Sequence, residues 1–133
     1  MWSSKDFGIL LLRISMSVLL LFHGINKVFN GIGFVKTKLA ENGLPEIIGY
    51  GVYIGEVMAP LLLLVGLKSR LMSFVIAINM LAAILLAKYD AIGQLTETGA
   101  WAVETPALFL LIALTLVFTG GGRYAISKGK MLD

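Results

Sequence analysis

The chain has 133 residues, of which 58% are hydrophobic and only 14% are charged. A soluble domain carries about 25% charged residues, so this chain lacks the polar side chains that a water-facing surface needs. The formal net charge is +3, cysteine is absent, and the basic residues form no cluster. These features exclude disulfides and thiolate metal sites, and they give no support for nucleic-acid binding.

Four apolar stretches follow one another along the chain, at residues 7–28, 45–67, 69–88 and 101–119. Each is near the roughly 20 residues that a helix needs to cross a hydrocarbon core about 30 Å thick. Backbone polar groups cannot stay unpaired in lipid, so apolar stretches of this length should be helical. The sequence therefore predicts an all-α fold, an integral membrane four-helix transmembrane bundle that forms a single domain over residues 1–133.

The longest connection, residues 31–44, has a helical pattern of its own. Ile32, Val35 and Leu39 recur at helical spacing, and Asn42-Gly43 is typical of a helix end. We expect a short interfacial helix between helices 1 and 2, lying at the membrane surface. An ordinary surface loop is the alternative.

The orientation is predicted by the lysines and arginines near the helix ends. With four spans, both termini share one side with the turn at Lys68 and Arg70, and this side carries six Lys and Arg residues against four on the other. Cytoplasmic loops carry the excess of these residues in membrane proteins, so we expect both termini to be cytoplasmic.

Charged side chains inside a membrane span are costly, and the first predicted helix contains two. By the 3.6-residue period, one face of this helix gathers nearly all its strongly polar side chains. The face comprises Arg13, Met16, Ser17, Leu20, His23, Gly24 and Lys27. We expect this face to point into the bundle. The alternative is that Arg13 and Lys27 extend to opposite membrane interfaces.

Glu56 is the sharpest single signal, because it lies about nine residues from the outer end of the second predicted helix, or roughly 13 Å deep. An unpaired carboxylate there would take up a proton, so Glu56 must be neutral or paired. Pro60 has no N–H for the carbonyl of Glu56, so the helix should kink and leave that carbonyl free. An acidic group beside a disrupted helix suggests a functional site, with Glu56 and Arg13 as the catalytic candidates. The alternative is a Glu56–Arg13 ion pair that only fixes helix packing.

Further polar residues are candidate cofactor-binding groups. Glu104, at the start of the fourth span, is expected to face Lys27 or His23. The alternative is an interfacial carboxylate that the helix dipole stabilises at the helix N-terminus. Asn79 lies near the middle of the third span, where an amide side chain usually forms a hydrogen bond to a neighbouring helix. His23, the only histidine, is either a packing residue or a proton relay with Glu56 or Glu104. No metal site is expected, since a single histidine without cysteine offers too few ligands.

The order and spacing of several residues resemble those of DoxX family proteins. The matching positions are Arg13, Gly24, Lys27, Glu56, Gly66, Arg70 and Glu104, together with the apolar run 61–67 and the glycines 120–122. The sequence departs from the family's Gly-Pro-Gly and Ser-x-Asp ending, because Gly121 replaces the proline and Ser127 is followed by Lys128-Gly129. The resemblance implies a small, multi-pass protein of the bacterial inner membrane, surrounded by lipid, with a four-helix bundle.

The DoxX family is named for a small subunit of a terminal quinol oxidase, and a related subunit occurs in thiosulfate:quinone oxidoreductase. The resemblance therefore implies an accessory subunit of a membrane oxidoreductase that binds quinone or quinol and has no redox centre of its own. In this hypothesis Glu56 exchanges a proton, Arg13 tunes its proton affinity, and His23 or Lys27 contacts a quinone oxygen. Protein partners in a redox complex would supply the electron carrier, and a homodimer is a further expectation. A non-catalytic membrane scaffold and a small transporter of a lipophilic or ionic solute are the alternatives.

Overall fold

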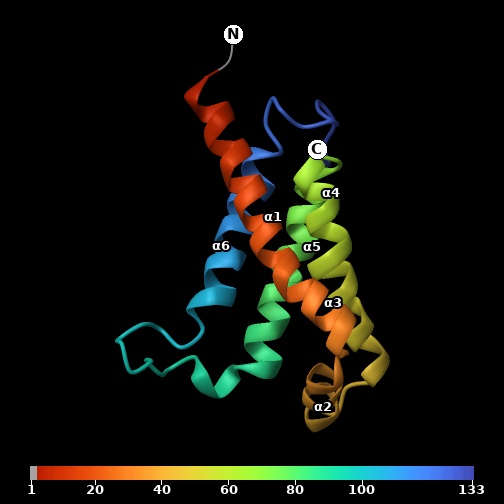
Figure 1. The fold of residues 1–133 in the computed structure, drawn as a ribbon, viewed down its shortest axis with the longest axis vertical. Coiled ribbons are helices and arrows are strands. Elements are labelled where there is room, and N and C mark those ends of the chain that lie inside the picture. Colours follow the sequence, from red (N-terminus) through yellow and green to blue (C-terminus); the bar gives the residue numbers. More distant parts are fainter. Residues whose placement is uncertain (1–2) are drawn as a thin grey trace.

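The computed structural model describes residues 3–133, and over this range it contains helices and no strand (Figure 1). In chain order the elements are α1 (Ser4–Asn30), α2 (Gly33–Glu41), the 3₁₀ turn η1 (Glu46–Tyr50), α3 (Gly51–Tyr53), the π-helical turn η2 (Ile54–Met58), α4 (Ala59–Val65), α5 (Ser69–Ala82), the π-helical turn η3 (Ala83–Ala87), the 3₁₀ turn η4 (Tyr89–Ala91) and α6 (Glu104–Thr119). The four elements from η1 to α4 follow one another directly and form one composite helix, Glu46–Val65. The predicted all-α fold is confirmed.

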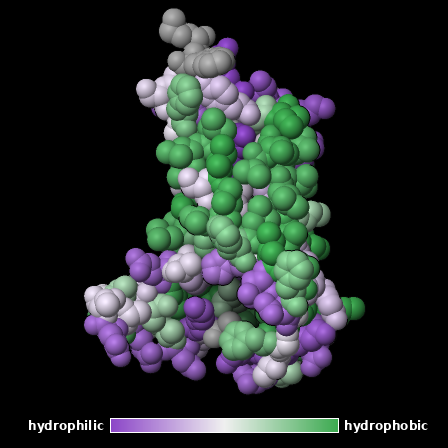
Figure 2. All heavy atoms as spheres, viewed as in Figure 1, coloured by the Kyte–Doolittle hydropathy of each residue, from purple (hydrophilic) through white to green (hydrophobic). Residues whose placement is uncertain are grey.

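Three helices are long and apolar enough to cross a membrane, namely Ser4–Asn30, Glu46–Val65 and Ser69–Leu86. The fourth, α6, is apolar but has 16 residues, about 24 Å at 1.5 Å per residue. It starts at Glu104 and not at residue 101, because Trp101 belongs to the preceding loop. There Trp101 pairs with Leu95 and its indole Nε1 donates to the carbonyl of Ile92 at 2.6 Å. Figure 2 shows a broad apolar band across the middle of the molecule, with hydrophilic residues gathered at both ends.

The four long helices pack around one apolar core. α5 lies along α6, and α1 packs against α4 and α6. The start of α1 and the C-terminus lie at one end of the bundle, and α2 lies at the other (Figure 1). The fully buried centre of the core consists of Met16, Leu20, Ala59, Leu63, Ile76, Ala113 and Leu116. Burying large aliphatic side chains in this way contributes about 1.5–3 kcal/mol for each in water, whereas in lipid close packing supplies the attraction.

The predicted polar face of α1 points into this bundle. Arg13, Met16, Ser17, Leu20 and Gly24 are all buried, as the helical period predicted. His23 differs, since its side chain is exposed at the edge of this face.

The predicted short helix between the first two spans is confirmed as α2. Its Leu39 and the preceding Ile32 are buried against Gly49 of η1. The Lys36 ammonium donates a hydrogen bond to the Tyr50 hydroxyl at 2.8 Å, and this bond raises the pKa of Lys36 above its ordinary value. These contacts fold α2 beneath the bundle, and its predicted position in the membrane interface stays a prediction.

At the other end, residues 120–133 fold back over the ends of α4 and α5. The N–H of Ile126 donates to the carbonyl of Val65 at 3.2 Å. The Leu132 carbonyl accepts from the N–H of Arg70 at 3.0 Å and so caps the first turn of α5. A helix leaves its first N–H groups without intrahelical partners, and this loop satisfies two of them for α5, at Arg70 and Leu71.

α1 approaches the composite helix closely at Gly24. A Cβ atom built on Gly24 would overlap the backbone carbonyl of Glu56 and contact the side chain of Val57. A backbone atom cannot move aside as the end of a flexible side chain can. Only glycine therefore allows the two helices to lie this close.

We expect Gly24→Ala to lower the free energy of unfolding by about 1–3 kcal/mol, because the added methyl group forces the two backbones apart. Gly8→Ala is the matched control on the same helix. A Cβ there has no neighbour within 4 Å, so this change should be neutral or should stabilise the helix by up to about 1 kcal/mol. Unfolding in detergent micelles measures both values, and equal stability of the two variants would contradict the proposed close contact.

Candidate functional site

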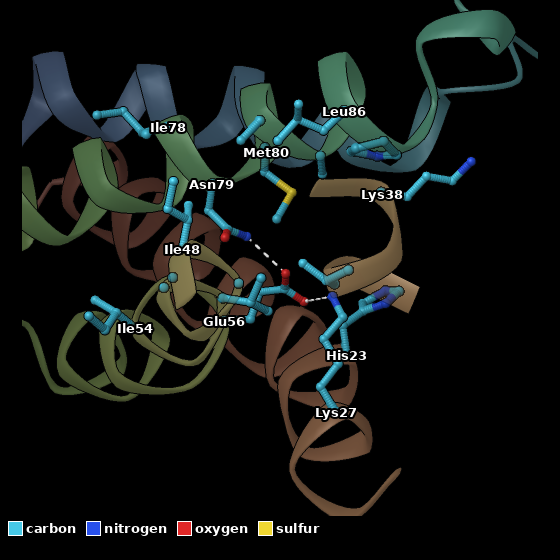
Figure 3. Close-up of a pocket in the computed structure, with 18 of the residues that line it drawn as sticks. His23, Lys27, Lys38, Ile48, Ile54, Glu56, Ile78, Asn79, Met80 and Leu86 are labelled. Atoms are coloured by element: carbon cyan, nitrogen blue, oxygen red, sulfur yellow. Dashed lines mark hydrogen bonds and ion pairs between the residues drawn. The ribbon is translucent and has the colours of Figure 1, made fainter. Parts of the chain in front are cut away.

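Glu56 is a buried carboxylate that has two partners, one from each neighbouring helix (Figure 3). Its side chain lies on the π-helical turn η2, and the residue is only 3% exposed. The Lys27 ammonium of α1 donates to Oε1 at 2.6 Å, and the Asn79 amide of α5 donates to Oε2 at 2.9 Å. Both carboxylate oxygens are thus hydrogen-bonded, and the partner of Oε1 is a positively charged ammonium. The group is therefore stabilised as a carboxylate within the bundle.

The π-helical turn beneath Glu56 follows from Pro60. In a regular α-helix the ring of Pro60 would clash with the carbonyl of Glu56, which would also lose its usual N–H partner. The wider π-helical turn avoids this clash. In this turn the N–H of Ala59 bonds the carbonyl of Ile54, five residues back, and not the carbonyl four residues back as in an α-helix. The sequence predicted a disruption at this point, and the structure shows it as a widened turn. The carbonyl of Glu56 is the atom against which Gly24 packs.

Gly55 gives Asn79 its place beside the carboxylate. A Cβ on Gly55 would lie 2.6 Å from the Cβ and Cγ atoms of Asn79. This distance is shorter than a van der Waals contact, so Asn79 would have to move away. The absence of a side chain at Gly55 lets α5 approach the π-helical turn and aim the Asn79 amide at Glu56. The small-residue pattern in this helix therefore positions a functional group as well as packing two helices.

The polar cluster borders a cavity of about 680 Å³. Its walls come from α1, α2, the composite helix, α5 with η3, and α6, and they are mainly apolar. Ile48, Ile54, Ile78 and Met80 lie around it in Figure 3. Three of these, Ile48, Ile54 and Ile78, are also exposed on the outside of the chain. The cavity therefore reaches the apolar surface of the bundle.

His23 and Lys27 lie on the same side of this cavity (Figure 3). The His23 ring packs edge-to-face on Phe109 of α6, with 5.9 Å between centroids and 85° between planes. Both residues of this pair line the cavity. His23 thus presents its ring to the cavity without taking part in the Glu56 hydrogen bonds.

The hypothesis that Arg13 pairs with Glu56 is wrong. Arg13 is buried, and its Nη1 donates to the carbonyl of Gly121 at 2.6 Å, with longer bonds of 3.4 Å to the carbonyls of Leu64 and Tyr124. The guanidinium therefore fastens the C-terminal loop to the bundle. The long side chain of Lys27 reaches Glu56 first, and carbonyl oxygens near the end of α4 and in the loop supply acceptors close to Arg13.

Glu104 does not make its predicted contact with Lys27 or His23. Its side chain is exposed, and it is absent from the residues that line the cavity. The next two residues, Thr105 and Pro106, line the cavity in its place. Because α6 starts at Glu104, this carboxylate lies on the first turn, where the positive end of the helix dipole stabilises it.

Sequence reasoning named Glu56, Lys27, Asn79 and His23 as candidates but did not predict that Lys27 and Asn79 contact Glu56. Depth along each helix placed Lys27 beside Glu104, because the sequence does not say how α1 crosses the composite helix. The available signal was glycine: Gly24 precedes Lys27 by one turn, and Gly55 adjoins Glu56. Small residues so placed allow close helix approach on both sides of the carboxylate.

The apolar band, the long apolar helices and the ion pair of the buried Glu56 define the chain as a helical integral membrane protein with a polar cluster inside its bundle. The chain belongs to the DoxX family, whose model matches residues 8–89. This match includes most of α1, the composite helix and α5, and thus all three members of the Glu56 cluster.

A relative of known sequence is "Putative oxidoreductase CatD" of Bacillus subtilis (strain 168). It is 28% identical to this chain over 133 residues, which cover 96% of this chain and 92% of the relative. No solved structure matches the chain.

We expect Lys27→Met to lower the free energy of unfolding by roughly 1–3 kcal/mol, because it leaves the buried Glu56 carboxylate without a counter-charge. Adding Glu56→Gln to that variant should recover most of the loss, since the double variant buries no charge. Thermal or chemical unfolding in detergent micelles measures this cycle.

Lys38→Met is the matched control for this cycle. Lys38 pairs with Glu41 across 3.5 Å, and the Glu41 side chain is largely exposed. Exposed pairs contribute little, so this variant should stay within about 0.5 kcal/mol of the parent chain. A Lys27→Met variant as stable as Lys38→Met would show that the Glu56 pair is not needed for the fold.

Proposed function

We propose that this DoxX family protein is an accessory membrane subunit of an oxidoreductase system, and that it binds a quinone or quinol in the cavity beside Glu56. The observation that carries the proposal is the Lys27–Glu56–Asn79 cluster on the wall of a mainly apolar cavity. An ion pair is expensive to keep inside a membrane bundle and commonly marks a functional site there.

The cavity suits such a ligand in size and chemistry. Its volume of about 680 Å³ lies within the roughly 300–1,000 Å³ of small-molecule sites, which are usually apolar with a few fixed polar groups. A quinone head group needs donors for its carbonyl oxygens, and a quinol needs an acceptor for its hydroxyl protons. Lys27 supplies the donor, Glu56 the acceptor, and His23 can act as either.

The exposed isoleucines support a lipophilic ligand in particular. Ile48, Ile54 and Ile78 line the cavity and also lie on the outside of the bundle. A ligand with an isoprenoid tail could therefore place its head group beside Glu56 and its tail along this apolar surface. A hydrophilic solute would gain nothing from that part of the wall.

The chain's own residues would hold and move protons in this proposal. Bound quinol supplies two electrons together with two protons. Glu56 would take one proton at a carboxylate oxygen, and Lys27 would keep the carboxylate oriented and charged until then. His23 lines the same cavity and is the candidate for a second proton, because an imidazole nitrogen can accept one.

A partner protein would carry the electrons. The chain has no cysteine and one histidine, so it offers few of the usual ligands for haem or an iron–sulfur cluster. The name of the Bacillus subtilis relative, "Putative oxidoreductase CatD", supports a redox setting for this chain. We propose that this chain contributes the membrane site and the partner contributes the redox centre.

The proposal predicts that decylubiquinone or menadione raises the melting temperature of the purified protein in micelles. Glu56→Gln should weaken binding at least about tenfold, which corresponds to about 1.4 kcal/mol, because the amide is a poorer acceptor and carries no charge. Titration of the melting temperature with each quinone measures the apparent Kd.

Glu46→Gln provides the control, since Glu46 is an exposed carboxylate on the same composite helix and lies outside the cavity lining. It should bind quinone like the parent chain. Absence of any quinone-dependent shift at saturating concentration would exclude the quinone site. Solute flux through liposomes that contain this chain alone would favour the transporter, and partner assembly unaffected by Glu56→Gln without quinone binding would favour the scaffold.

A further inference from the structure

A second cavity, of about 310 Å³, lies at the opposite end of the bundle from α2. It is enclosed by the start of α5, the end of α6 and the C-terminal loop. The residues that line it are Arg70, Thr119, Gly120, Gly121, Gly122, Ser127, Lys128, Gly129, Lys130 and Asp133. This cavity shares no residue with the one beside Glu56.

The lining carries three cations and one carboxylate side chain. Arg70, Lys128 and Lys130 form no ion pair within residues 3–133. The Asp133 side chain offsets only one of these three positive charges. Its Oδ1 accepts from the Ser127 hydroxyl at 2.9 Å and its Oδ2 from the backbone N–H of Lys130 at 3.2 Å. The cavity therefore keeps a surplus of positive charge.

The backbone around the cavity also suits an anion. Gly120, Gly122 and Gly129 have φ values of 74°, 80° and 88°, so the loop turns through left-handed conformations that favour glycine. The N–H groups of Gly122 and Gly129 have no recorded acceptor within the described part of the chain. Backbone N–H groups in such loops form concave sites for anions.

Apolar side chains stand out into the surroundings beside these cations. Phe118, Ile126 and Met131 are 79%, 66% and 85% exposed, and each is the immediate chain neighbour of a residue that lines the cavity. A site for a free inorganic anion would have no use for them. A phospholipid has both parts, an anionic phosphate for the cavity and acyl chains for the apolar side chains.

We propose that this cavity binds the phosphate group of an anionic phospholipid, with Arg70 and Lys130 as its main ligands and the acyl chains along Phe118. Basic pockets at the membrane boundary recognise anionic head groups in this way. The site is independent of the quinone proposal, because it lies at the other end of the bundle and uses other residues. Arg13 links it to the core, since its guanidinium holds the carbonyl of Gly121 in the cavity wall.

The melting temperature of the protein in detergent micelles with added lipid tests this proposal. Phosphatidylglycerol should raise the melting temperature of the parent chain by about 3 °C or more over phosphatidylcholine, whose choline group repels the lining cations. Inorganic phosphate at millimolar concentration is the third arm and should give a much smaller shift. A shift by phosphate as large as that by phosphatidylglycerol would overturn the assignment to lipid.

The double variant Arg70→Gln/Lys130→Gln should lose most of the difference between the two lipids. Lys5→Gln/Lys68→Gln is the matched control. It removes the same charge from the same end of the bundle, and neither lysine lines the cavity. Retention of the lipid difference in the first double variant, or its equal loss in both, would contradict the proposal.

Should Arg70→Gln prevent folding, Lys128→Gln/Lys130→Gln replaces it. Both lysines are exposed on the loop, so this variant should fold and should reduce the phosphatidylglycerol shift at least twofold. An unchanged shift in that variant would overturn the proposal.

Discussion

The structure depends on one constraint, that a carboxylate inside a membrane bundle needs a counter-charge and hydrogen-bond donors. Lys27 and Asn79 meet this need from two different helices, so the Glu56 cluster fixes how α1, the composite helix and α5 lie relative to one another. Loss of a single partner would leave a charge or a polar group unsatisfied beside a mainly apolar cavity. The cluster therefore joins the geometry of the bundle to the chemistry of its cavity.

The backbone around Glu56 is adapted to that cluster. Pro60 disfavours a regular α-helix at Glu56, and a π-helical turn forms there in its place. Such π-helical turns are common at functional sites in helices. Gly24 and Gly55 remove side chains on either side of this turn. Both π-helical turns in the described part of the chain, η2 and η3, contribute residues to the same cavity wall. The widened backbone thus occurs where a ligand would lie.

The two ends of the bundle have different chemistry. One holds a mainly apolar cavity bordered by the Lys27–Glu56 ion pair. The other holds a smaller cavity whose cations form no ion pair with any residue that the structure describes. Arg13 serves the second end, although its position in the sequence suggested the first. It binds carbonyl oxygens of the C-terminal loop, so a charge that sequence reasoning assigned to chemistry instead holds a loop in place.

The sequence by itself determined the all-α membrane fold, the buried face of α1 and the candidates Glu56, Lys27, Asn79 and His23. These follow from apolar length, helical period and the cost of charge in lipid, which are local properties of the chain. Only the tertiary structure decided that Lys27, and not Arg13, pairs with Glu56, and that Glu104 lies outside the cavity. Pairing depends on where helices cross and how closely they approach. That is set by contacts such as Gly24 on the Glu56 carbonyl, between residues far apart in the sequence.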